Sequence, residues 1–245
     1  MTRSLKTISL TLLLAALTVS ALAATGAFAG EEDPEEGNTI GELSAKQYPA
    51  TLDGTDKANE TNAFTLSTLK IECPDSSFTG TIAAATSTFT IMPTYNNANC
   101  VQGTRKATVI TNGCGYEIEL LNTTTLGYKD NYFFLTNIIC PENKDIEIRI
   151  FEGGTENVEY CKFTIKEQKG LKKGKLQNLP VGGVTNGTFK LERFIENIVA
   201  TKSSGAGGCG NEEVKDGKYD IGIEFKGTTN AGGVNDVTVS HPTKD

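Results

Sequence analysis

The sequence predicts an all-β protein: an antiparallel β-sandwich, immunoglobulin-like or related, that is held together by disulfides. Three observations support this prediction. Apolar and polar residues alternate along short segments, turns rich in glycine and asparagine separate these segments, and the chain carries six cysteines. Alternation with a period of two is typical of strands with one buried and one solvated face. Regularly spaced turns are typical of all-β domains.

Residues 1–29 have the pattern of a signal peptide. Arg3 and Lys6 form a short basic start, an apolar run follows from Ile8 to Leu22, and Ala27-Phe28-Ala29 has the small-x-small pattern that signal peptidase reads. The apolar run is shorter than the about 20 residues that span a bilayer. We therefore predict a secreted protein with no membrane insertion after cleavage, and a retained anchor is the alternative.

Both ends of the mature chain are polar. The stretch "EEDPEEGN" predicts a disordered acidic leader over 30–46, and we expect a polar C-terminal tail over 230–245. The net charge of the full chain is −7, and removal of 1–29, which carries two basic residues and no acid, lowers it to −9 (−7 − 2). Such a charge disfavours binding to nucleic acid or to anionic lipid.

The β-sandwich domain is expected over 47–229, with two β sub-domains that meet near 166–187 as an alternative. The alternation places its strands. In "YEIEL", for example, Tyr116, Ile118 and Leu120 share the core face and two glutamates share the other face. The strands predicted in this way are, in chain order, 69–73, 78–82, 88–91, 116–120, 146–150 and 219–225.

The segment "LERFIENIV", residues 191–199, contains two competing patterns. Its apolar residues recur at i, i+3, i+4, i+7 and i+8, which fits a helix. A turn at Glu196-Asn197 would instead make a hairpin over 189–201. Because β-branched residues and glycine-rich breaks surround the segment, we favour the hairpin.

Six cysteines in an exported chain predict disulfides, because an even set of thiols pairs in an oxidising compartment. Cys73 and Cys100 lie symmetrically about a predicted hairpin turn in "AAATS". Opposed positions in a hairpin come close to the Cα separation of about 5.5 Å that a disulfide prefers. These two cysteines are therefore expected to pair.

The other four cysteines allow two arrangements. Cys114 and Cys140 are symmetric about "TTTLGYKDN", which leaves Cys161 to pair with Cys209. The rival set joins Cys140 to Cys161 and Cys114 to Cys209, and spacing does not choose between the two sets. No zinc site is expected, since the chain has no C-x-x-C pair and its one histidine, His241, lies in the tail.

A longer set of motifs resembles a known group of proteins. It reads "YPATLDGT…FTLSTLKIEC…SFTGTIAAATSTFTIMPTYNNANC…ATVITNGCGYEI…NIICPENKDIEI…YCKFTI" and covers most of 48–165, with a looser match over 218–229. The "YPATL" opening, the threonine-rich hairpins, the "NGC" turn and the "CP" turn are similar to those of uncharacterised secreted actinobacterial proteins. The resemblance implies export and a β-rich fold, and it implies no activity.

Few residue patterns point to catalysis. A serine or cysteine nucleophile needs a neighbouring base, most often histidine, and His241 is the only histidine. The stretch "GAGGCG" at 205–210 lacks the lysine and the following helix of a phosphate loop. We therefore expect no catalytic residue and no cofactor. A pair of carboxylates that hydrolyses glycans is the alternative, because acidic residues are plentiful.

Two acidic stretches offer oxygen ligands for calcium. Neither has the residue spacing of a known calcium loop, so we expect solvated turns and no metal. A calcium-dependent adhesin remains the alternative. The acidic residues concerned are Asp53, Asp56, Glu60, Glu212, Glu213, Asp216 and Asp220.

Two polar stretches are candidate contacts for a polymer. The segment "KEQKGLKKGK", residues 166–175, carries five lysines and one glutamate, and we interpret it as a solvated loop or hairpin rather than as a contact for an acidic wall polymer. Thr79, Thr81, Thr88 and Thr90 are expected on the face opposite the apolar residues of their strands. Such a surface could bind ordered water or a polysaccharide, but threonine is favoured on any half-exposed strand, so we interpret it as scaffold.

These observations predict a secreted, non-enzymatic structural or binding module of the cell envelope or extracellular space. A cell-wall polymer or a glycan is the partner class that we consider. The alternatives are a secreted carboxylate-dependent glycan hydrolase and a calcium-dependent adhesin.

Overall fold

The computed structural model of the chain describes residues 41–240 with gaps at 59, 122–130, 155, 157, 182–183, 206, 208, 210–211 and 230–233. The described residues all belong to one compact unit, Pro34–Asp245, and the other unit is Met1–Asp33. The predicted signal peptide, the leader up to residue 40 and His241 lie outside the described residues. Within the described part of the chain, no helix is long and apolar enough to cross a membrane.

The regular secondary structure of the described residues consists of strands and one short 3-10 turn at Glu152–Gly154. The strands are β1 (Glu42–Ala45), β2 (Ala50–Asp56), β3 (Asn62–Leu66), β4 (Leu69–Cys73), β5 (Ser77–Ile82), β6 (Thr88–Thr94), β7 (Val101–Gln102), β8 (Arg105–Ile110), β9 (Gly115–Leu120), β10 (Asn131–Ile139), β11 (Ile146–Phe151), β12 (Glu159–Ile165), β13 (Gln168–Val181), β14 (Val184–Ser204), β15 (Glu212–Thr229), β16 (Val234–Asn235) and β17 (Val237–Ser240).

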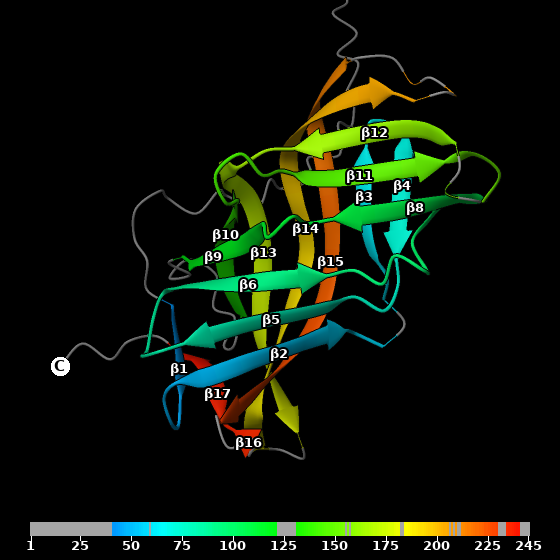
Figure 1. The fold of residues 1–245 in the computed structure, drawn as a ribbon. Coiled ribbons are helices and arrows are strands. Elements are labelled where there is room, and N and C mark those ends of the chain that lie inside the picture. The colour runs from blue at the N-terminus through cyan, green and yellow to red at the C-terminus, as the bar shows by residue number, and fades with distance from the viewer. Residues whose placement is uncertain are drawn as a thin grey trace, which may run out of the picture. The chain divides into compact units, whose positions relative to one another are not determined.

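One antiparallel sheet of fifteen strands closes on itself twice. The first ring runs β15, β2, β5, β6, β9, β10, β13, β14 and returns to β15. The second ring runs β15, β3, β4, β7, β8, β11, β12, β14 and also returns to β15. Both rings therefore share the β14–β15 pair. Figure 1 shows β2, β5 and β6 from the first ring and β8, β11 and β12 from the second crossing in front of β13, β14 and β15.

The all-β, antiparallel and disulfide-bonded fold is confirmed, whereas the sandwich of two separate sheets is not. The reason is the length of two strands: β14 has 21 residues and β15 has 18, so each can pair with strands of both rings. The stretch near 166–187 is also not a boundary between sub-domains. Strand β13 runs through 168–181 and pairs with both β10 and β14.

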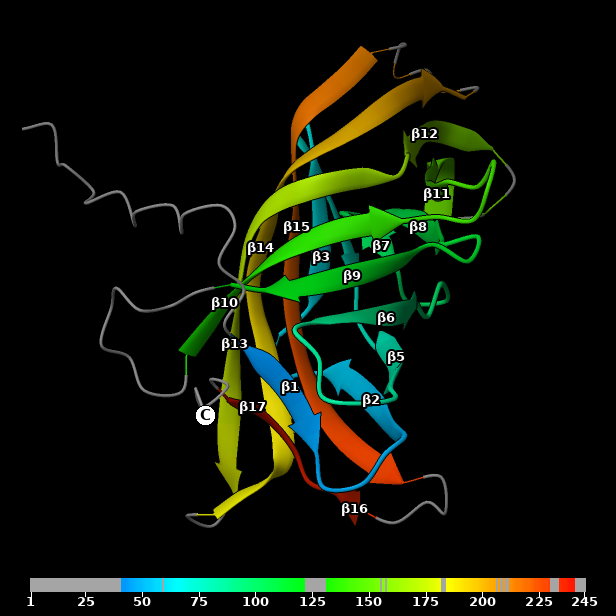
Figure 2. The same cartoon turned by 90° about the vertical axis from the view of Figure 1, so that its left-hand side faces the viewer.

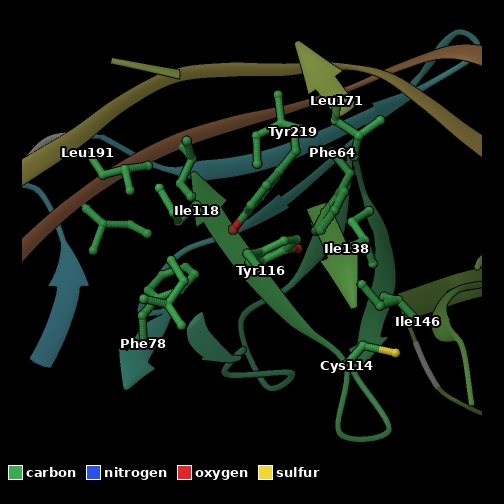
Figure 3. Close-up of a cluster of buried hydrophobic side chains, with 14 of the residues drawn as sticks. Phe64, Phe78, Cys114, Tyr116, Ile118, Ile138, Ile146, Leu171, Leu191 and Tyr219 are labelled. Carbon is green, nitrogen blue, oxygen red and sulfur yellow. The ribbon is translucent and has the colours of Figure 1, made fainter. Parts of the chain in front are cut away.

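The alternating pattern places one face of each strand in a single continuous hydrophobic core. Phe78 on β5, Phe89 on β6 and Phe225 on β15 are all buried in the first ring. Phe225 stacks on Phe189 of β14 with ring centroids 5.0 Å apart. Figure 3 shows part of this core, in which residues from several strands converge on Tyr116 and Tyr219. These inward positions are those that the sequence predicted.

Neither the hairpin nor the helix that we considered over 189–201 is present, because β14 runs through the segment without turning. Asn197 has a positive φ of 65°, as a turn residue would. The ladder with β15 shifts register between Ile195 and Ile198 instead of ending. The turn-like pair Glu196-Asn197 is therefore part of a β-bulge, since β15 stays paired with β14 on both sides of it.

The predicted leader over 30–46 and tail over 230–245 both contain strands of the fold. Residues 42–45 form β1, which pairs with β17, residues 237–240, in a separate two-stranded ribbon. Figure 2 shows the two strands side by side. Leu43, Val237 and Val239 are at most 2% exposed. The burial of these three apolar side chains explains why segments that look polar by composition are ordered here.

The three disulfides are Cys73–Cys100, Cys114–Cys140 and Cys161–Cys209, so the first set of pairings is confirmed and the rival set is wrong. The first two bridges extend antiparallel ladders. Cys73–Cys100 follows the one register pair that joins β4 to β7, and Cys114–Cys140 follows the last pair of the β9–β10 ladder. Pairing across a hairpin thus brings the symmetric positions together, as the spacing predicted.

Candidate functional site

The outer surface of β2, β5 and β6 is rich in hydroxyl groups, and we call it the hydroxyl face. Ten positions on these strands face outward, because they alternate with the core residues. Eight of the ten are serine or threonine. The hydroxyl residues are Thr51, Thr55, Ser77, Thr79, Thr81, Thr88, Thr90 and Thr94, and the other two positions are Asp53 and Met92.

Strand register places these side chains in rows across the sheet. One row runs Thr55, Ser77, Thr94 over β2, β5 and β6. Another pairs Thr51 with Thr81 and continues to Thr228 on β15. Neighbouring strands lie about 4.8 Å apart and alternate residues on one strand about 6.6 Å apart, which sets the spacing of the hydroxyls. The face therefore extends over more strands than the two that the sequence indicated.

The exposure of the side chains confirms which way the strands face. Thr79, Thr81 and Thr88 are exposed and Thr90 is half-buried, whereas Phe78 and its inward neighbours are buried. A glycine in β5, Gly80, lies on the inner side, and a Cβ there would come within 2.6 Å of the Thr90 carbonyl oxygen. Close contact between β5 and β6 thus requires glycine at this position.

The one charge on the hydroxyl face, Asp53, has close polar neighbours. Lys226 of β15 lies directly opposite it in register. The Thr228 hydroxyl donates a hydrogen bond of 3.0 Å to the Asp53 carboxylate. Lys226 balances this one charge, but the strands on either side of the face add glutamates. Glu224 of β15 lies opposite Thr55, and Glu119 of β9 lies opposite Thr88.

The outer surface of β11 and β12 is charged instead, and we call it the charged face. The Glu147 carboxylate accepts hydrogen bonds from Arg149 Nη2 at 2.6 Å and lies 2.8 Å from Lys162 Nζ. The hydrogen bonds from Lys162 and Arg149 hold the pKa of Glu147 below its ordinary value. Nearby, the guanidinium of Arg105 lies 4.3 Å from the centre of the Tyr160 ring.

The first acidic stretch, Asp53 to Glu60, does not converge on a cation site. Asp53 is on the hydroxyl face, whereas Asp56 accepts hydrogen bonds from the Asn62 side chain and from the Ser76 N–H. Burial raises the pKa of Asp56 in spite of these hydrogen bonds. Glu60 pairs with Lys57. These carboxylates therefore hold the ends of β2 and β3 in place.

The second acidic stretch is spread along β15. Glu212 pairs with Lys202 at 3.0 Å and Glu213 with Lys215 at 3.1 Å. Asp220 lies several residues further along the same strand, about 3.3 Å per residue away. Among the residues that the structure describes, no group of three or more His, Cys, Asp or Glu side chains could hold a metal ion.

One group of carboxylates gathers on the outside of β14 and β15, around Gly222. Lys57 Nζ contacts both Glu60 and Glu192, with the Glu192 oxygen 2.7 Å away. Burial acts to raise the pKa of Glu192, but hydrogen bonds from Lys190 and Lys57 hold it below its ordinary value. Burial, aided by the charge of Glu60, raises the pKa of Asp220. A glycan hydrolase, the alternative considered above, would have to draw its pair of catalytic carboxylates from this group.

A chain of three tyrosine hydroxyls lies in the core between the two rings. The Tyr95 hydroxyl donates to the Tyr219 hydroxyl at 2.9 Å and lies 3.0 Å from the Tyr116 hydroxyl. Tyr219 also stacks on Phe64 with centroids 4.2 Å apart (Figure 3). Burial raises the pKa of all three tyrosines well above the ordinary value, so they stay protonated and neutral.

The sequence predicted core positions for Tyr116 and Tyr219 but not their contact. Tyr116 belongs to β9 in the first ring, Tyr95 follows β6 on the way to β7, and Tyr219 belongs to the shared strand β15. Only the pairing of distant strands brings the hydroxyls together. A buried polar network of this kind fixes how the two parts of the core fit, which is a structural role.

The remaining candidate segments have structural positions. In the lysine-rich stretch, Lys166 and Glu167 are exposed between β12 and β13, and the stretch from Gln168 onward is strand rather than loop. In the glycine-rich stretch, Cys209 is half-buried and is bonded to Cys161 of β12. That stretch therefore carries one end of a disulfide.

The chain matches no protein-family model, and searches of curated proteins and of solved structures also return no match.

Proposed function

We propose that this protein is a secreted, non-enzymatic module of the cell envelope or extracellular space that binds or organises a polymer through its outer sheet surface. The observation that carries the proposal is the hydroxyl face, where eight of ten outward positions on three adjacent strands are serine or threonine. A broad, regular, polar surface suits contact with an extended partner better than it suits chemistry on one bond.

Export is supported by two independent features. Three disulfides join all six cysteines, which favours an oxidising compartment. Residues 1–29 have the composition and cleavage pattern of a signal peptide. The resemblance to secreted actinobacterial proteins agrees with this location.

A non-enzymatic role is supported by what the charged groups do. Glu147, whose pKa is lowered, pairs with Arg149 on its own strand and with Lys162 of β12. Glu192, whose pKa is also lowered, pairs with Lys190 on its own strand and with Lys57, which follows β2. Asp56, whose pKa is raised, holds Asn62 and a backbone N–H. Each of these groups is engaged in joining one strand to another.

The test is a binding assay with the mature chain, 30–245, and isolated cell walls. We expect the protein to sediment with the walls and to release no soluble sugar or peptide from them. Release of reducing sugar that is lost in Asp220→Asn would replace this proposal with the hydrolase. Binding that disappears with a calcium chelator would replace it with the calcium-dependent adhesin.

A further inference from the structure

The hydroxyl face differs from the charged face by its near absence of charge. Strands β11 and β12 place Glu147, Arg149 and Lys162 at outward positions, as is usual for a solvated sheet surface. The outward positions of β2, β5 and β6 carry one charge in ten. The charges of the neighbouring strands, such as Lys226 and Glu224 of β15 and Glu119 of β9, lie at its edges. The high β-propensity of threonine applies equally to both surfaces, so propensity alone does not explain the difference.

The composition of the face defines the chemistry of a partner. A hydroxyl both donates and accepts hydrogen bonds, so rows of hydroxyls match a ligand that offers donors and acceptors together and carries no net charge. An anionic ligand that bound here would lose its contact with water and find Lys226 as the one cation placed against these strands in register, which is costly. The acidic surface of the mature protein would also repel an anionic polymer. The hydroxyl groups of an uncharged sugar polymer meet the first requirement and avoid both costs.

The geometry favours an extended chain over a small ligand. Rows such as Thr55, Ser77, Thr94 cross three strands, and Thr228, Thr51, Thr81 cross a partly different set. At about 4.8 Å between strands, each row presents a hydroxyl at every step for about 10 Å or more. A polymer that lies along such a row can make several weak hydrogen bonds at once.

We propose that the hydroxyl face binds an uncharged polysaccharide chain through the serine and threonine hydroxyls of β2, β5 and β6. This inference rests on the proposed function and names the class of polymer. Met92 lies opposite Thr79, between the two rows of hydroxyls, and is 37% exposed. Its thioether side chain supplies an apolar contact for the less polar side of a sugar ring.

The experiment measures co-sedimentation of the mature chain with three insoluble neutral polymers, amorphous cellulose, chitin and starch granules, and with polygalacturonate beads as the anionic polymer. The test variant is Thr55→Val/Thr79→Val/Thr81→Val, which removes three hydroxyls from exposed positions and keeps the branched side-chain shape. We expect wild type to bind at least one neutral polymer and the variant to bind it about tenfold more weakly or worse, because three hydrogen bonds are lost.

Two further variants separate the loss of hydroxyls from other effects. Thr65→Val/Thr164→Val/Thr201→Val makes the same chemical change on outward positions of the second ring and should bind as wild type does. Thr55→Ser/Thr79→Ser/Thr81→Ser keeps the hydroxyls and should also bind. Near-unchanged melting temperatures for all three variants would show that they fold, as expected for outward-facing sites outside the core.

The outcomes separate this inference from the proposed function. Binding to isolated walls without binding to any neutral polymer would overturn the inference and leave the proposed function in place. Equal binding by wild type and the Thr55, Thr79, Thr81 valine variant would do the same. Light scattering that shows a dimer, lost in that variant, would make a second copy the occupant and overturn the inference. Failure to bind walls and all polymers would overturn both.

Discussion

The hydroxyl face and the charged face belong to the same sheet but are stabilised differently. Strands β2, β5 and β6 form ladders of four to seven register pairs with their neighbours, above an aromatic core. The second ring includes β7, with two residues, and joins β4 to β7 through the single register pair Glu72 and Val101. The disulfide Cys73–Cys100 lies beside this single pair. The ion pairs of the charged face lie on a β11–β12 ladder of six register pairs, so the charge of an outer surface is set by its side chains and not by the length of its ladders.

The largest expected effect tests whether the two rings are one cooperative unit. Phe225→Ala in the first ring and Phe163→Ala in the second should each lower the free energy of unfolding by about 3–5 kcal/mol, since both side chains are fully buried. Because the core is continuous, each variant should shift one and the same transition. Circular dichroism and tyrosine fluorescence through a urea titration measure this. Two separated transitions in either variant would show that the rings unfold independently.

The next effect concerns the disulfides. Replacing Cys73 and Cys100 together by alanine should cost about 3–4 kcal/mol, from the freed loop alone. Replacing Cys161 and Cys209 should cost less, although that loop is longer (48 against 27 residues), because Cys209 is half-buried whereas Cys73 and Cys100 are fully buried beside the shortest ladder. Urea unfolding of the two double variants gives both values. The reverse order would mean that loop length, not the short β4–β7 ladder, decides the effect.

A smaller effect tests the tyrosine chain between the rings. Tyr95→Phe removes the hydroxyl that contacts Tyr116 and Tyr219 and leaves both of these buried groups with fewer partners, so we expect a loss of about 1–3 kcal/mol. Tyr160→Phe is the matched control, because it keeps the ring beside Arg105 and should change stability little. Equal melting temperatures for the two variants would contradict a structural role for the hydroxyl chain.

The smallest effects are pH-dependent and have opposite signs. The pKa of Glu147 is lowered in the folded state, so its charge stabilises the fold at neutral pH, and this contribution disappears as the pH falls through its folded pKa, below the ordinary 4.5. The pKa of Asp220 is raised, so its charge destabilises the fold at neutral pH and the penalty disappears on acidification.

Glu147→Gln should therefore lower the free energy of unfolding at pH 7, and Asp220→Asn should raise it, each by no more than about 1 kcal/mol. Both differences should shrink as the pH falls from 7 toward 3, because both carboxylates become protonated. Urea titrations of the two variants from pH 7 to pH 3 measure this. Differences that stay constant with pH would show that packing rather than charge is responsible.

Local sequence patterns predicted the parts of the fold that local geometry decides. Alternation in "YEIEL" placed Tyr116 and Ile118 inward, and symmetry about two hairpin turns paired Cys73 with Cys100 and Cys114 with Cys140. The prediction failed where neighbouring strands override a local signal. At Glu196-Asn197, residues that favour a turn are held in a strand because β15 pairs with β14 on both sides of them.

The candidate site was only partly predictable for a similar reason. The threonines of β5 and β6 were identified because the two strands form a local hairpin. Thr51 and Thr55 were not, since β2 is separated from β5 by two strands in the sequence and its pairing is not encoded in the spacing. The charges at the edges of the face likewise come from β15 and β9, through Lys226, Glu224 and Glu119, which strand pairing brings beside it.

The pairing of β1 with β17 has a consequence for how this molecule matures. Ser44 of β1 and Thr238 of β17 lie 194 residues apart in the sequence, and the strands of both rings lie between them. Strand β1 therefore stays without its partner until the chain has been synthesised through β17. Closure of this ribbon can only follow the synthesis of every strand in both rings, so it is a late step in folding.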